Sequence, residues 1–191
     1  MAELRQVILI GPHGAGKSTL GRALAARLGW RYDDEIGERL RREALARDPD
    51  AHAGRPQETF DEAVLQAELE RDEEALRRGV PRVVETWHPG NLAYARARSA
   101  AIAAQMEPRL RESAARIAGE ILVQPLLASE QSLRARRHEP GPLELTLWFL
   151  AVGLEATAIA TGWGLRVVEP VYTDRGDPES CLATICARLR P

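Results

Sequence analysis

The segment Gly11–Thr19 has the residue types and spacing of a phosphate-binding loop. It fits the pattern G-x-x-x-x-G-K-[ST], in which glycines let the backbone turn tightly and point successive N–H groups inward. The motif follows an apolar run and opens a helical pattern, so a helix N-terminus adds the positive end of its dipole. The segment therefore predicts a site for the phosphates of a nucleotide.

Each residue of this loop has an expected task. We expect Lys17 to bridge the terminal phosphates, Ser18 to bind Mg²⁺, and Thr19 to reach a phosphate further back. His13 is expected only to cover the loop. The predicted cofactors are thus ATP and Mg²⁺, and the predicted contacts are Gly11, His13, Gly14, Ala15, Gly16, Lys17, Ser18 and Thr19.

Lys17 is also the only lysine among the 26 basic residues of the chain. Everywhere else the positive charge is carried by arginine. An exception at this one position indicates that a compact, flexible ammonium is required there, and not a planar guanidinium.

Acidic residues end two of the predicted strands, where ligands of open parallel sheets bind. Glu85 follows Val83 and Val84 directly, and it is the best candidate to bind Mg²⁺ or to accept a proton; an ion pair to an arginine is the alternative. Asp33 or Asp34 could act on the phosphoryl acceptor, or cap the next helix.

A third cluster is basic. Arg134, Arg136 and Arg137 lie on one short helical segment flanked by proline and glycine. Phosphoryl transfer needs positive charge over the migrating group, which a mobile arginine lid can supply. The alternative is a solvated charged face.

The elements that must position these residues alternate between strand and helix. Such alternation predicts an α/β fold with an open parallel sheet of five strands covered by helices on both faces. The predicted strands are 7–10, 30–32, 82–86, 121–126 and 165–171. The predicted helices are 18–28, 35–47, 59–78, 91–105, 109–118, 131–137, 143–161 and 178–190, with Pro108 separating two of them.

Length and composition narrow the class of protein. A chain of 191 residues, 45% apolar and 28% charged, fits one soluble domain, and a net charge of −2 does not favour polynucleotide binding. No apolar run is predicted to reach membrane-spanning length, and no signal peptide is evident, so we expect a cytoplasmic protein. Cys181 and Cys186 are interpreted as free thiols on a helix.

Taken together, the chain resembles the P-loop nucleoside and nucleotide kinase superfamily. That resemblance implies a three-layer αβα fold with sheet order 2-3-1-4-5, a helical acceptor-binding region over 35–80 and an arginine-rich lid over 129–142. It also implies that Arg136, or Arg175 in the loop after the last strand, contacts the adenine base.

Two branches of that superfamily are similar in part. Glu85–Ala95 keeps the spacing of the thymidylate kinase segment D-R-Y-x-x-S-x-x-A-Y-Q, which implies that Trp87 and Tyr94 line the acceptor pocket; a core position for Trp87 is the alternative. Tyr32–Ile36 is similar to the D-x-D-x-E-I pattern of shikimate kinase, which implies Asp33 at the acceptor hydroxyl. The first motif lacks its Arg, Ser and Gln here, which argues against thymidylate as the acceptor. The triple-glycine acceptor site of shikimate kinase is also absent, which argues against shikimate.

We therefore expect an ATP-dependent kinase that transfers the γ-phosphoryl group to a nucleotide, a nucleoside or a similar small polar metabolite. Lys17, Glu85, Asp33, Arg134 and Arg137 are the expected catalytic residues. A nucleotide-dependent regulatory or assembly ATPase and an antibiotic-modifying phosphotransferase are the alternatives. The oligomer is expected to be a monomer or a homodimer, with the apolar helix 143–161 either buried or forming the dimer face.

Overall fold

Parallel strands form the centre of the protein in the computed structural model, which describes residues 4–48, 57–136 and 142–189. The strands run in the order β2-β3-β1-β4-β5, and β6 also pairs with β4. The predicted α/β fold and its strand order are therefore confirmed. The strands are β1 (Gln6–Ile10), β2 (Arg31–Asp33), β3 (Arg82–Glu85), β4 (Ile121–Leu127), β5 (Arg166–Val167) and β6 (Val171–Tyr172).

The last predicted strand is divided in two. A single strand was expected over 165–171, but β5 pairs with the middle of β4 and β6 with its end. Pro170 lies between them and cannot donate a hydrogen bond to a ladder, which explains the interruption.

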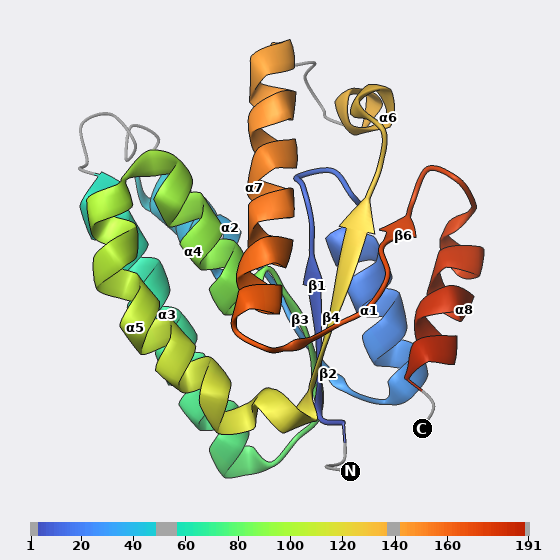
Figure 1. Ribbon diagram of the computed structural model, residues 1–191, viewed down its shortest axis with the longest axis horizontal. Coiled ribbons are helices and arrows are strands. Elements are labelled where there is room, and N and C mark those ends of the chain that lie inside the picture. Colours follow the sequence, from blue (N-terminus) through green and yellow to red (C-terminus); the bar gives the residue numbers. More distant parts are fainter. Residues whose placement is uncertain (1–3, 49–56, 137–141, 190–191) are drawn as a thin grey trace.

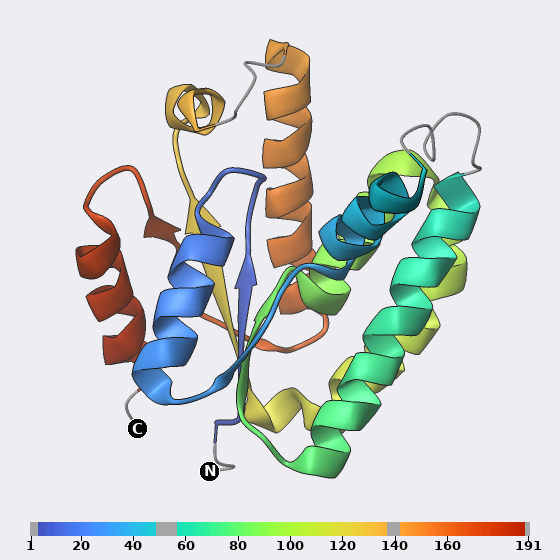
Figure 2. The same cartoon turned by 180° about the vertical axis from the view of Figure 1, so that it is seen from behind.

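Helices cover both faces of the sheet (Figure 1). They are α1 (Lys17–Leu28), α2 (Ile36–Arg47), α3 (Gln57–Arg78), α4 (Trp87–Arg98), α5 (Ala100–Ile117), α6 (Glu130–Ala135), α7 (Leu143–Gly162) and α8 (Pro178–Arg188), with a 3₁₀ turn, η1 (Ala118–Glu120). Figure 2 shows α1 and α8 together on one face, opposite the face that α7 covers.

Successive side chains of β1 point to opposite faces of the sheet and so belong to two separate layers of the core. Val7 and Leu9 pack with residues of α1 and α8, whereas Ile8 and Ile10 pack with residues of α4, α5 and α7. All four side chains are at most 1% exposed, as expected for a strand buried on both faces.

Two helix boundaries differ from the prediction. The segment 87–90 was expected to break the chain, but α4 begins at Trp87, because Pro89 falls in the first turn where a backbone N–H has no helical partner. Pro108 was expected to separate two helices, yet it lies inside α5. The break occurs instead at Ser99, whose hydroxyl accepts a hydrogen bond from the Ile102 N–H at 3.4 Å.

Helix α7 is the apolar helix expected over 143–161, and it extends one residue further, to Gly162. Its length and mean hydropathy of 1.6 are enough to cross a membrane, so the statement that no apolar run reaches that length is wrong. One side of α7 packs on the core through Val152, Ala156 and Ile159, while Leu147 and Leu154 on other sides are exposed. The expected burial thus holds for one side of the helix, and the dimer face stays a prediction.

Candidate functional site

The loop between β1 and α1 has the backbone geometry that phosphate binding requires. Gly14 and Gly16 both adopt φ of 86°, a left-handed conformation that glycine takes without strain. Gly16 is the N-cap of α1, and Lys17 is its first helical residue. The first turn of a helix leaves backbone N–H groups without helical partners, so the start of α1 at this loop can hold an anion.

Lys17 lies folded over this loop. Its side chain is 6% exposed, and Nζ donates hydrogen bonds to the carbonyl oxygens of Gly11 at 3.1 Å and Pro12 at 3.3 Å. The same Nζ lies 4.0 Å from Oε2 of Glu35. The ammonium is thus held at the loop by neutral acceptors and one carboxylate.

Glu85, at the end of β3, contacts the first turn of α1. Its Oε2 accepts a hydrogen bond from Ser18 Oγ at 3.0 Å, and its Oε1 accepts one from the Tyr32 hydroxyl. Burial raises the pKa of the Glu85 carboxyl, and the hydrogen bond from Tyr32 and the charge of Lys17 offset only part of that rise. Burial and the contact with Glu85 also raise the pKa of Tyr32.

These oxygens suit a magnesium ion. Mg²⁺ prefers hard oxygen ligands and is usually held by one or two protein groups together with substrate phosphates. The described residues contain no group of three or more His, Cys, Asp or Glu arranged to hold a metal. Ser18 and Glu85 supply such oxygens side by side, and their role as magnesium ligands stays a prediction.

The backbone after β3 is strained. Thr86 and Trp87 have φ of 66° and 48°, values that cost side-chain-bearing residues about 1–3 kcal/mol each. The turn directs the Thr86 hydroxyl to Glu35, whose Oε2 accepts its hydrogen bond at 2.8 Å. The strained residues thereby fix a carboxylate beside Lys17.

A cavity of about 370 Å³ opens on this side of the loop. Aromatic rings form much of its wall: the Tyr94 and Trp148 ring centroids are 5.7 Å apart, and those of Trp148 and Phe149 are 5.1 Å apart. Glu35 and His13 also line it. We refer to it as the aromatic cavity.

Of the two aromatic residues predicted to line the acceptor pocket, one lines this cavity and the other does not. Tyr94 lines the aromatic cavity, but Trp87 does not: it is fully buried, and its Nε1 donates to both carboxylate oxygens of Asp72, at 3.1 and 3.2 Å. Trp87 therefore occupies the core position that the sequence left as the alternative.

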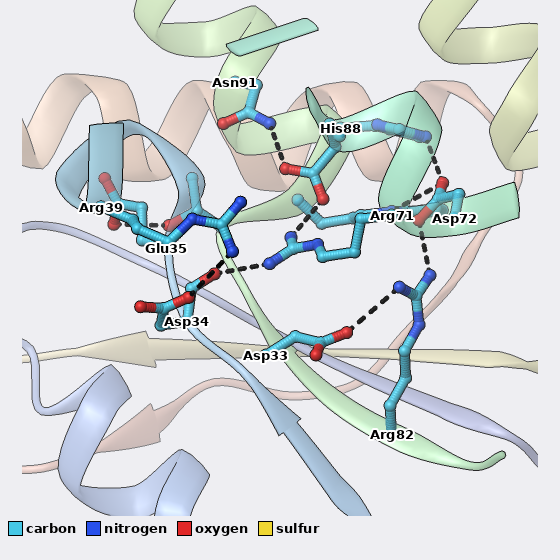
Figure 3. Close-up of polar contacts among 12 residues, drawn as sticks. Asp33, Asp34, Glu35, Arg39, Arg71, Asp72, Arg82, His88 and Asn91 are labelled. Carbon is cyan, nitrogen blue, oxygen red and sulfur yellow. Dashed lines mark hydrogen bonds and ion pairs between the residues drawn. The ribbon is translucent and has the colours of Figure 1, made fainter. Parts of the chain in front are cut away.

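A buried charge network joins β2, β3, α3 and α4 (Figure 3). Arg82 lies between two carboxylates and donates to Asp33 at 3.2 Å and to Asp72 at 2.5 Å. Asp72 also lies 2.7 Å from His88. Burial alone would raise the pKa of Asp72, but His88 and Arg82 outweigh it and lower that pKa.

The network engages Asp33, the residue expected to contact the acceptor hydroxyl. Asp33 is 7% exposed, accepts hydrogen bonds from Arg31 at 2.5 and 2.9 Å as well as from Arg82, and does not line the aromatic cavity. Asp34 turns outward, with Oδ2 3.6 Å from Arg42 and Oδ1 4.0 Å from Arg39.

Glu35, and neither of these two aspartates, lines the aromatic cavity. It lies in the same acidic run after β2, but it is not among the site residues predicted from the sequence. Its position two residues beyond the end of the strand is the signal that could have identified it, because that turn faces the phosphate loop.

A second cavity, also of about 370 Å³, lies on the other side of the loop. Arg136 lines it, donating to Thr173 Oγ1 at 2.8 Å, to the Thr173 carbonyl at 2.7 Å and to the Gly14 carbonyl at 3.3 Å. The cavity is further lined by Gly16, Thr19, Leu20, Pro178 and Cys181. Arg136 thus joins α6 to the phosphate loop.

The other predicted arginines point elsewhere. Arg134 pairs with Glu130 on its own helix at 3.3 Å. The Arg175 Cζ lies 3.9 Å from the centroid of the Tyr172 ring. Arg134 and Arg175 are both exposed. Arg137 lies outside the described residues.

Helix α7 touches both the loop and the aromatic cavity. An added Cβ at Gly153 would lie 2.7 Å from the Pro12 nitrogen and 3.0 Å from the Gly11 carbonyl carbon, so only glycine fits there. One turn before it, the Phe149 ring centroid is 5.2 Å from that of His13. The loop therefore rests directly on this helix.

Three comparisons with known proteins agree with this geometry. The family model described as the AAA domain matches residues 6–140. The shikimate kinase of Actinobacillus succinogenes is 59% identical over 34 residues, which cover 18% of this chain and 19% of that protein. The match thus spans about a fifth of the length of this curated relative.

Solved structures extend the similarity to the whole fold. A deoxyadenosine kinase from M. mycoides superposes with a TM-score of 0.66 at 14% identity, covering 96% of this chain and 98% of that one. A thymidylate kinase from Ehrlichia chaffeensis has a TM-score of 0.62 at 13% identity, covering 99% and 100%. At such identities the likeness concerns the fold.

Proposed function

Since the chain belongs to the AAA-domain family and has the fold of P-loop nucleoside and nucleotide kinases, we propose that it is an ATP-dependent small-molecule kinase. One observation carries this proposal: two cavities adjoin the phosphate loop, and the neighbouring residues His13 and Gly14 line different ones. A phosphotransferase needs a donor site and an acceptor site that meet at the transferred phosphate.

The nucleotide would bind through the loop and the second cavity. The N–H groups of the loop and the Lys17 ammonium would hold the phosphates, and Arg136 and Thr173 would border the rest of the nucleotide. Magnesium, when bound at Ser18 and Glu85, would neutralise charge on the phosphates.

The acceptor would occupy the aromatic cavity. Glu35 is the carboxylate that lines this cavity and also lies 4.0 Å from Lys17. We assign it the task of accepting the proton of the acceptor hydroxyl as the phosphoryl group transfers. Glu85 has both oxygens occupied by Ser18 and Tyr32, so its task is to orient the Ser18 hydroxyl and the metal.

The test is ADP release with ATP and Mg²⁺, measured without an acceptor and with a panel of nucleosides, nucleoside monophosphates, sugars and other small hydroxylated metabolites. Stimulation by an acceptor, with the phosphorylated product detected, supports a kinase. Slow hydrolysis that no acceptor changes would instead support a regulatory or assembly ATPase, one of the two alternatives from the sequence.

A further inference from the structure

The charges of the aromatic cavity bear on what kind of acceptor it takes. Three carboxylates, Glu35, Glu38 and Asp61, line it against two guanidinium groups, Arg41 and Arg98. A phosphate monoester brings a charge of about −1.5 to −2 at neutral pH, and proteins hold it with unpaired arginines. A cavity for a phosphorylated acceptor would therefore need free positive charge.

Arg98 does not offer that charge. Its Nε donates to Asp61 Oδ2 at 3.1 Å, and its Nη2 donates to the other oxygen, Oδ1, of the same carboxylate. Asp61 is 2% exposed, and the Arg98 side chain is 20% exposed. The two groups form a paired fork in which a buried carboxylate neutralises the guanidinium and fixes its direction.

The other charged residues that line the cavity do not supply a free positive charge in place of Arg98. Glu35 is held beside Lys17 by the Thr86 hydroxyl, where its negative charge would oppose a second phosphate close to the loop. Arg41 and Glu38 are both exposed and of opposite sign, so neither provides a desolvated cationic site.

The walls of the cavity favour a planar ring. Tyr94, Trp148 and Phe149 form one aromatic cluster, with the Tyr94 and Phe149 centroids 6.5 Å apart, and Phe60 lines the cavity from α3. Aromatic side chains bind flat rings by offset or edge-to-face contact.

We propose that the aromatic cavity takes an unphosphorylated acceptor of the nucleoside class, with a planar ring and a free hydroxyl, and that Asp61 excludes the monophosphate by pairing with Arg98. This proposal rests on the kinase function proposed above. Asp61 is a specificity residue here, since it acts through Arg98 and not on the reacting atoms.

The experiment measures binding and turnover separately, using nucleosides and their own 5′-monophosphates as matched probes. Binding is followed by calorimetry without ATP. For the unmodified protein we expect the preferred nucleoside to bind at least tenfold more tightly than its monophosphate. This comparison needs no variant, so it decides the matter even if a substitution prevents folding.

The variant Asp61→Asn frees the Arg98 guanidinium and should shift the ratio of the two affinities at least tenfold toward the monophosphate. The control is Glu62→Gln, the next residue, whose pair with Arg109 at 2.8 Å is exposed and whose side chain does not line the cavity. Equal shifts in both variants would overturn the role of Asp61.

The remaining outcomes separate the two proposals. Tighter binding of monophosphates by the unmodified protein, or no binding of either probe, would overturn the acceptor class. Monophosphate-dependent ADP release would overturn it too and leave the kinase function standing. Nucleoside binding without any acceptor-dependent ADP release would overturn the kinase function alone.

Discussion

The carboxylate of Glu35 lies 4.0 Å from the ammonium of Lys17, and both side chains adjoin the phosphate loop. The two residues come from different strand ends: Lys17 begins the helix after β1, and Glu35 follows β2. The Thr86 hydroxyl, presented by strained backbone, holds the carboxylate in place. The carboxylate that we propose as proton acceptor and the ammonium that we propose as phosphate-binding cation are thereby held side by side.

The first prediction concerns Glu35. Replacing it by glutamine keeps the shape but removes the proton acceptor, so acceptor-dependent kcat should fall about 10²–10⁴-fold. Nucleotide affinity, measured by calorimetry, should change little. The control is Glu38→Gln, an exposed carboxylate that lines the same cavity. A loss of kcat as large in the control would remove the special role of Glu35.

The second prediction concerns Glu85 and turnover. Glu85→Gln removes the negative charge that orients Ser18 Oγ, so kcat should fall about 10²-fold and the Mg²⁺ concentration for half-maximal rate should rise. ADP release titrated with MgCl₂ measures both. Unchanged turnover and magnesium dependence would exclude Glu85 from the mechanism.

The same substitution should stabilise the fold at neutral pH. The pKa of Glu85 is raised, so the stability that its protonated form contributes is present below its ordinary pKa and is lost as pH rises through the folded value. Glutamine does not ionise and avoids that loss. Each kcal/mol gained should raise Tm by about 2–4 °C.

This gain should shrink as the pH falls toward about 4, because the Glu85 carboxyl of the parent protein becomes protonated there and no longer loses that stability. Thermal unfolding at the two pH values measures it, and Glu73→Gln, exposed on α3, is the control. A Glu85→Gln protein that is less stable than the parent at neutral pH would show that the hydrogen bonds outweigh burial.

The third prediction concerns the only lysine. Lys17→Arg keeps the charge but places a larger planar group in a site that is 6% exposed, so ADP release should fall at least about 10²-fold. The reverse exchange Arg27→Lys, exposed on the same helix, should leave the rate unchanged. Full activity of Lys17→Arg would show that only the charge matters.

The fourth prediction tests the contact between α7 and the loop. Gly153→Ala would press a methyl group to within 2.7 Å of the Pro12 nitrogen, so the loop must shift. We expect stability to fall by about 1–3 kcal/mol and nucleotide affinity to fall with it.

A matched control lies on the same helix. At Gly162 an added Cβ meets nothing within 4 Å, so Gly162→Ala should leave affinity unchanged and stability equal or slightly higher. Denaturant unfolding and nucleotide calorimetry compare the two variants. Equal behaviour of both would mean that the loop does not depend on this contact.

Much of the fold could be predicted because its signals are local. The run Val7–Ile10 indicates a buried strand, Gly29 ends the first helix in a left-handed conformation, and Ser129 caps α6. The helix boundaries that were predicted wrongly are those where a local sequence rule competes with tertiary packing. Pro108 breaks a helix by rule, but α5 continues through it as part of a long buried face.

The candidate site divides in the same way. The phosphate loop depends on consecutive residues, so its strand, turn and helix could be placed from the sequence. The partner of each acidic residue could not, because Asp33 and Arg82 are 49 positions apart and meet only through the β2–β3 pairing.

The sequence by itself determined the phosphate loop, the alternation of strands and helices, and the sheet that follows from them. These depend on spacing along the chain, which residues near one another encode directly. Only the tertiary structure decided how the charged side chains pair. Asp33 accepts hydrogen bonds from Arg31 and Arg82, and Arg98 donates to Asp61. Glu35 lies beside Lys17. A charge can act on a ligand only where no nearer opposite charge holds it, and that depends on which distant segments come together.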